Sequence, residues 1–214
     1  MDWPQGTIPV KKVAVDAAMA VEQIGCLHDF IIASDSVEPL KGFSGNVLQK
    51  DYKGRDAIMV AAFYGRPKCL QWLMLNTAIS TGARNKRDGG RTALMYACGA
   101  ARDVSNVGGG CGGNNAGPQV FSCSPAFAEC VRLLTDASCT TELLNYRSTH
   151  GMTALHYACC VGDSVVVDTL LLRSDLDTLA ANDEGQHATD LTRDDNIIEK
   201  ARACGYYARH HTQR

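Results

Sequence analysis

One phrase occurs twice in this sequence and constrains the fold more than any other feature. It reads Gly90-Arg-Thr-Ala-Leu-Met-Tyr-Ala-Cys98 the first time and Gly151-Met-Thr-Ala-Leu-His-Tyr-Ala-Cys159 the second time. A weaker copy begins at Gly54 and a fourth at Gly185, so the four glycines are separated by 36, 61 and 34 residues. Self-similarity near the length of one supersecondary unit indicates an array of stacked repeats, in which the long interval fits a unit with roughly 28 additional residues.

Each glycine is followed by residues typical of a short helix. Thr92 and Thr153 stand where a hydroxyl can cap the first backbone amides of a helix. The segments 69–74 and 165–171 then carry apolar residues at helical spacing. Helices this short are not stable alone, so they must be stabilised by stacking on neighbouring units. The sequence therefore predicts an all-α fold of helix-turn-helix units joined by hairpin-like loops.

The copies resemble the ankyrin repeat, in which a Gly-x-Thr-Pro-Leu-His-x-Ala motif opens the first helix and Leu-Leu ends the second. The third copy matches best, through Gly151, Thr153, Leu155, His156, Ala158, Gly162 and Leu170-Leu171. The first copy keeps Asp51, Gly54, Ala61 and Gly65, and the second keeps Gly90, Thr92, Leu94 and Ala97 before it resumes at 130–134. Alanine replaces the family's proline at 57, 93, 154 and 188. The resemblance implies an ankyrin-repeat solenoid.

This interpretation divides the chain into one array with two short ends. An N-terminal tail spans 1–12, the array spans 13–205, and a polar C-terminal tail spans 206–214. A degenerate first unit is expected over 13–49, with its second helix after Gly25, and further units start near residues 51, 87, 148 and 182. Gly and Asn dominate 107–117 and disfavour helix, so a flexible insertion is predicted over about 102–124. Ser124-Pro125 would restart the helix after it.

Composition narrows the classes of partner. A net charge of −2 gives no general attraction to nucleic acid or to anionic membranes. No apolar stretch approaches the ~18 residues that a membrane-spanning helix needs. The first residues are neither basic nor followed by an apolar run, so a secretory signal is not expected. We expect a monomer in the cytoplasm, with the nucleus as the alternative, and neither nucleic-acid nor membrane partners.

Ten cysteines raise the question of a metal site or disulfides. None of them forms a Cys-x-x-Cys pair. Cys69, Cys98, Cys130 and Cys159 fall where the helical stripe needs a small apolar residue, which favours a packing role. Disulfides and a metal site are the weaker alternatives. The ankyrin resemblance implies that His156 braces a hairpin, and no nucleophile–base motif is present. The sequence thus predicts no metal, no cofactor and no catalytic residue.

The resemblance implies a non-enzymatic protein–protein interaction module, an adaptor or scaffold that binds a protein partner through its concave face. A structural or regulatory subunit of a larger complex is the alternative, followed by an enzyme that uses the cysteines and histidines. The residues implied to contact the partner are Tyr52, Lys53, Arg55, Phe63, Tyr64, Asp88, Arg91, Thr149, His150, Met152 and Val161. Those of the first copy form the densest set, and we expect them to be only partly buried. Aromatic and arginine side chains are the usual anchors of interfaces.

Overall fold

Short helices joined by turns make up the described part of the protein. The computed structural model describes residues 27–99, 125–136 and 139–211, with side chains described as far as Cys204. Within these ranges, backbone pairing outside helices and turns is limited to two isolated bridges, Asn85–Arg91 and Ala181–His187, and no strand is present. The prediction of an all-α fold is therefore confirmed for the described residues.

The elements follow one another in pairs. Their bounds are α2 Leu27–Ala33, α3 Glu38–Lys41, α4 Ala57–Phe63, α5 Pro67–Asn76, α6 Ala93–Gly99, α7 Pro125–Thr135, α8 Thr141–Leu144, α9 Ala154–Val161, α10 Ser164–Leu171, the 3₁₀ helix η2 Ala188–Leu191 and α11 Asp195–His211. None of the described helices combines the length and apolar character that a membrane crossing requires.

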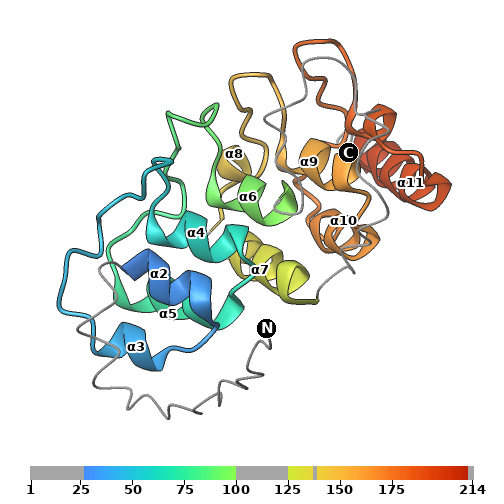
Figure 1. Cartoon of the computed structure of the whole chain (residues 1–214). Helices are drawn as coiled ribbons and strands as arrows, with labels where there is room; N and C mark the ends of the chain where they lie inside the picture. The colour runs from blue at the N-terminus through green and yellow to red at the C-terminus, as the bar shows by residue number, and fades with distance from the viewer. Residues whose placement is uncertain (1–26, 100–124, 137–138, 212–214) are drawn as a thin grey trace, which may run out of the picture.

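These helices are arranged in two rows (Figure 1). In the first row α4, α6, α9 and η2 contact one another in chain order, and in the second row α5, α7, α10 and α11 do the same. Each first-row helix also packs on the second-row helix that follows it. The loops that lead into the first row project along one edge of the molecule, at the top of the view. We call the tips of these four loops, at residues 51–55, 85–91, 148–152 and 182–186, the first to fourth hairpins.

Local sequence explains where the helices begin and end. The carboxylate of Asp56 accepts the Met59 N–H at 2.9 Å and so caps α4. Pro67 and Pro125 are the first residues of α5 and α7, a position where the missing N–H of proline costs nothing. The second of these confirms that a helix restarts at Pro125. Gly162 ends α9 in the left-handed conformation, with φ of 76°.

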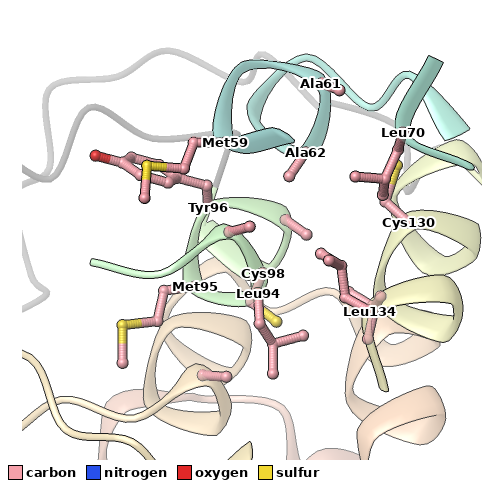
Figure 2. Packing of buried hydrophobic residues seen from close by; sticks show 14 of the residues in the cluster. Met59, Ala61, Ala62, Leu70, Leu94, Met95, Tyr96, Cys98, Cys130 and Leu134 are labelled. Atoms are coloured by element: carbon pink, nitrogen blue, oxygen red, sulfur yellow. The ribbon is translucent and has the colours of Figure 1, made fainter. Parts of the chain in front are cut away.

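The core lies between the two rows. Ala61, Ala62 and Ala97 are buried, and their small side chains let neighbouring helices approach closely. Figure 2 shows the side chains of α6 packed between α4 and α7, with Leu134 and Cys130 facing them from α7. Burial of this apolar surface, summed along the rows, is the main stabilising contribution, because each helix alone is too short to be stable.

Four cysteines belong to this core, as their sequence positions predicted. Cys69, Cys98, Cys130 and Cys159 are all buried and carry free thiols. Burial raises the pKa of Cys69, Cys130 and Cys159 to about 12. The same cause raises the pKa of Cys98. The thiols therefore stay protonated at neutral pH and pack as small apolar side chains.

The structure differs from the sequence interpretation at both ends of the array. Of the degenerate first unit, only residues from Leu27 on are described. There α2 packs on α4, which places it in the row of first helices rather than as the second helix that was expected after Gly25. The short α3 then follows it, where the other units carry a longer second helix. At the other end α11 continues to His211, so the boundary at 205 falls within a helix. The predicted insertion over about 102–124 lies outside the described residues.

Candidate functional site

A side chain with an acceptor oxygen opens each hairpin. These residues are Asp51, Asn85, Ser148 and Asn182. The side-chain oxygen of each accepts a backbone N–H two to four residues further on, at 2.8–3.2 Å. This is the turn-forming bond for which Asp, Asn and Ser are suited. The first two residues are 34 positions apart, as are the last two, so this spacing marks the start of each unit. The predicted unit starts, near residues 51, 87, 148 and 182, lie at or close to these residues, but the turn-forming role of Asn85, Ser148 and Asn182 was not predicted.

The second hairpin is longer than the others. The N–H of Asn85 donates to the Arg91 carbonyl at 2.9 Å, six residues ahead. In the first hairpin the N–H of Asp51 donates to the Arg55 carbonyl, also at 2.9 Å, only four residues ahead. The two additional residues explain why the interval from Gly54 to Gly90 is 36 rather than 34. They also make the second hairpin the one that carries the most residues at its tip.

Neighbouring hairpins are bonded to one another through backbone atoms. The N–H of Thr149 donates to the Gly89 carbonyl at 2.8 Å, and the N–H of Asp183 donates to the His150 carbonyl at 3.2 Å. The first two hairpins are bonded through a side chain instead: the amide of Asn85 donates to the Lys53 carbonyl at 3.0 Å. The hairpins thus form a continuous row with fixed spacing.

His156 braces the third hairpin against the fourth. Its side chain is fully buried, and Nε2 lies 3.2 Å from the Gln186 carbonyl, which can only accept a hydrogen bond. Nε2 therefore carries the proton, and Nδ1 accepts from the backbone N–H of Thr153 at 3.2 Å. Burial lowers the pKa of His156, so the ring is neutral at pH 7. This is the bracing role that the resemblance implied.

Tyr96 performs the corresponding task in the second unit. The position equivalent to His156 is Met95, which is buried and has no polar atom to share. Instead the Tyr96 hydroxyl accepts from the Asn85 amide at 2.8 Å and donates to the Asp88 carboxylate at 2.7 Å. Burial raises the pKa of Tyr96, so the phenol keeps its proton and can donate. The hairpin is held to its helix by a network that the family motif does not contain.

The segment 150–183 matches the model of the ankyrin repeat. The matched segment runs from the tip of the third hairpin, through α9 and α10, to the tip of the fourth hairpin. The resemblance to the ankyrin repeat family is thereby confirmed for this segment. A comparison with curated proteins finds no significant match to the chain.

Ankyrin repeats are in general interaction modules rather than enzymes, and they imply a protein partner. Within the described residues no three His, Cys, Asp or Glu side chains come together as possible metal ligands. The buried cysteines lack the electropositive, accessible surroundings of a reactive thiolate.

The structure distributes the predicted contact residues over the hairpins and the ends of first-row helices. Tyr52, Lys53, Thr149 and His150 are exposed, and Phe63, Tyr64, Asp88, Arg91, Met152 and Val161 are partly buried. Tyr52 is the most prominent of them, with 81% of its surface exposed. An exposed aromatic side chain on a fixed loop is available to a partner without rearrangement.

The expected burial of Arg55 was wrong. The side chain was expected to be partly buried, but only 4% of its surface is exposed. Its Nε lies 2.7 Å from the Asp51 carboxylate, and its guanidinium lies 4.6 Å from the centre of the Phe63 ring. Asp51, which opens the first hairpin, is thus an almost buried acid with a cation beside it, and removal of one partner of such a pair is costly. Arg55 supports the first hairpin, and its burial leaves little of its surface accessible.

An aromatic cluster lies below the first two hairpins. The ring of Phe63 packs edge-on against Tyr64, with centroids 5.0 Å apart, and against Tyr96 at 6.0 Å. Arg55 covers Phe63 and lies 5.9 Å from the Tyr64 ring. Edge-to-face pairs of this kind favour one ring orientation. Phe63 and Tyr64 thus keep partly exposed faces in a fixed arrangement beside the hairpins.

Proposed function

We propose that the chain is an ankyrin-repeat solenoid that serves as a non-enzymatic adaptor or scaffold. It binds a protein partner through the hairpins and the face of the first-row helices beside them. The observation that carries this proposal is Tyr52, which is 81% exposed on a hairpin whose backbone is bonded to the next one. A large aromatic side chain kept in water on a fixed loop stabilises no part of the fold, but it is the kind of anchor that interfaces use.

Two further observations support this proposal. The partly exposed rings of Phe63 and Tyr64 add aromatic surface at the end of α4, where Phe63 also contacts Tyr96 of α6. Bonds between neighbouring hairpins fix their relative positions before any partner arrives, which lowers the ordering cost of association. Buried, protonated thiols suit a reducing compartment, so we place the protein in the cytoplasm or nucleus.

A photo-crosslinking amino acid tests the proposal without disturbing the fold. It would replace Tyr52 in one variant and Leu172 in the other, because Leu172 is equally exposed, at 83%, but lies at the end of a second-row helix. We expect a discrete crosslinked protein from cells that carry the Tyr52 variant and none with the Leu172 variant. Equal crosslinking from both positions, or crosslinking from Leu172 alone, would place the binding surface elsewhere.

A paired substitution refines the result. The double variant Tyr52→Ala, Lys53→Ala removes two exposed side chains, so its thermal melting should match that of the wild type. Arg55 is left intact because it is buried. In this double variant the photo-crosslinker is placed on another hairpin. Loss of crosslinking to the partner from that position, with an unchanged melting temperature, supports the proposal.

A further inference from the structure

Charged side chains are distributed unevenly along the row of hairpins. Lys50, Lys53, Arg84, Lys86, Arg87 and Arg147 are all exposed on or beside the first three hairpins. The tip of the fourth hairpin instead exposes Asp183 and Glu184. The chain as a whole carries a net charge of −2, so this positive end of the row is a local feature and does not follow from composition.

Five of these six cations form no ion pair within the described residues, whereas Arg147 pairs with Asp183. The Arg84 guanidinium lies 4.2 Å from the centre of the Tyr146 ring. We call the other four, Lys50, Lys53, Lys86 and Arg87, the basic patch. Lys53 and Arg87 interact instead with Tyr52. The ammonium of Lys53 lies 5.8 Å from the Tyr52 ring centre, and a guanidinium nitrogen of Arg87 donates to the Tyr52 carbonyl at 3.1 Å.

The acidic residues of the same two hairpins are already engaged. Asp51 is paired with Arg55 at 2.7 Å, and its carboxylate is almost fully buried. Asp88 accepts hydrogen bonds from Tyr96 at 2.7 Å and from Arg91 at 3.2 Å. Neither carboxylate neutralises the basic patch. The positive charge at these tips is therefore available to a ligand.

We propose that the basic patch binds an acidic segment of the partner protein. The proposal rests on the function proposed above and names the chemistry of its ligand. Carboxylates of the segment would pair with Lys50 and Lys53 on the first hairpin and with Lys86 and Arg87 on the second, while an aromatic or apolar side chain between them packs on Tyr52. Such charge complementarity accelerates association and fixes register.

The charge pattern favours a protein segment over a nucleic acid. A phosphate backbone carries negative charge at every nucleotide. Along the row it would meet Asp183 and Glu184, both exposed. A protein segment can confine its acidic residues to the part that faces the basic patch. The mixed sign of the hairpin row therefore matches a partner whose charge also changes along its length.

The experiment uses a fluorescent peptide in which glutamates flank a central tyrosine, and an otherwise identical peptide with glutamines. Binding to the full chain would be followed by fluorescence anisotropy at low and at physiological salt. We expect the glutamate peptide to bind at least about tenfold more tightly than the glutamine peptide, and its affinity to fall as salt rises.

A charge-matched pair of variants locates the site. The triple variant Lys53→Glu, Lys86→Glu, Arg87→Glu should weaken binding of the glutamate peptide by about tenfold or more. The control Lys68→Glu, Arg193→Glu, Arg202→Glu changes the net charge equally at exposed residues outside the hairpins, and should bind as the wild type does. Equal loss in both variants would overturn the proposal, because it would reveal attraction to net charge alone.

Two further outcomes also overturn it. A single-stranded oligonucleotide that binds the patch more tightly than the glutamate peptide would make the surface one for nucleic acid. Failure of the glutamate peptide to bind at low salt would rule out an acidic segment as the ligand of the basic patch. If crosslinking through Tyr52 still succeeds in that case, the proposed function stands and only the ligand chemistry is wrong; if both fail, neither proposal holds.

Discussion

The second and third hairpins solve the same structural problem with different side chains. In the third, His156 bonds to the start of its own helix and to the Gln186 carbonyl of the next hairpin. In the second, the equivalent Met95 is apolar, and Tyr96 and Asn85 provide the polar connections. The third unit falls in the segment that matches the ankyrin repeat, whereas the second does not. The stack thus requires a bonded hairpin, and more than one set of residues can supply it.

The largest expected difference between these hairpins concerns their glycines. Gly90 and Gly151 both have positive φ, at 71° and 69°, so alanine at either costs about 1–2 kcal/mol of backbone strain. A Cβ on Gly90 would lie 3.4 Å from the Tyr146 hydroxyl and 3.9 Å from the Thr149 methyl, but one on Gly151 would lie 2.8 Å from the backbone nitrogen of Asp183. We expect Gly151→Ala to lower the free energy of unfolding by roughly 2–5 kcal/mol, well beyond Gly90→Ala. Urea denaturation of both variants measures the free energy of unfolding. Equal losses would mean that the fourth hairpin moves aside to accommodate the added methyl group.

The next largest expected difference in stability is between substitutions of His156 and of its apolar equivalent, Met95. His156→Leu leaves the Thr153 N–H without its partner and removes one of the two hydrogen bonds at the Gln186 carbonyl, which keeps the Asn182 N–H at 2.8 Å. The free energy of unfolding should therefore fall by roughly 2–4 kcal/mol. Met95→Leu exchanges two apolar side chains of similar volume and should cost under about 1.5 kcal/mol. Chemical denaturation of the two variants compares them directly. A larger loss for Met95→Leu would show that the second unit depends on packing at that position more than the third depends on its bonds.

Removal of single hydroxyls sharpens the comparison further. Tyr96→Phe breaks two hydrogen bonds and leaves the buried Asn85 amide with only the Lys53 carbonyl, so a loss of about 1–3 kcal/mol is expected. Tyr157→Phe, at the equivalent position of the third unit, breaks only the 3.2 Å bond from Arg91 and should cost about 0.5–1.5 kcal/mol. Thermal melting monitored by circular dichroism ranks the two. Identical melting would indicate that Tyr96 contributes through its ring alone.

The smallest effect is a difference in pH dependence. Burial lowers the pKa of His156 below 6.5 in the folded chain. Just below pH 6.5 the unfolded chain therefore binds a proton at this residue that the folded chain does not bind. Stability is therefore complete above about pH 6.5 and declines as the pH falls through that value. The same cause lowers the pKa of His28, which adds to the decline. Urea denaturation at pH 7.5 and 5.5 should show a smaller decline in His156→Leu than in Met95→Leu. Equal declines would assign the pH dependence to other groups.

Much of the fold was predictable because the repeated motif encodes it. Gly151, Thr153 and His156 specify a turn, a cap and a brace within a few residues, and the alanines mark close helix contacts. The role of Tyr96 was not predictable in the same way, because its partners Asn85 and Asp88 belong to a loop whose length differs from the others. The 34-residue spacing from Asp51 to Asn85 and from Ser148 to Asn182 is the sequence signal that identifies the side chains at the predicted unit starts.

The burial of the candidate site residues was predictable only in part. Phe63 and Tyr64 are partly buried as expected, whereas Tyr52 is more exposed than expected. The expectation failed for Arg55, because burial of that side chain depends on the Asp51 carboxylate and on the Phe63 ring, and no local pattern specifies those contacts. The position of α2 was likewise set by packing on α4 rather than by the glycine before it.

The bonds between neighbouring hairpins have an evolutionary consequence. Most of them end on backbone atoms: the Gly89, His150, Lys53 and Gln186 carbonyls accept them, whatever side chains those residues carry. Mutation can therefore replace the side chains at the tips without breaking the connections that align the units. Selection for a new partner can act on these positions while the stack beneath is inherited intact.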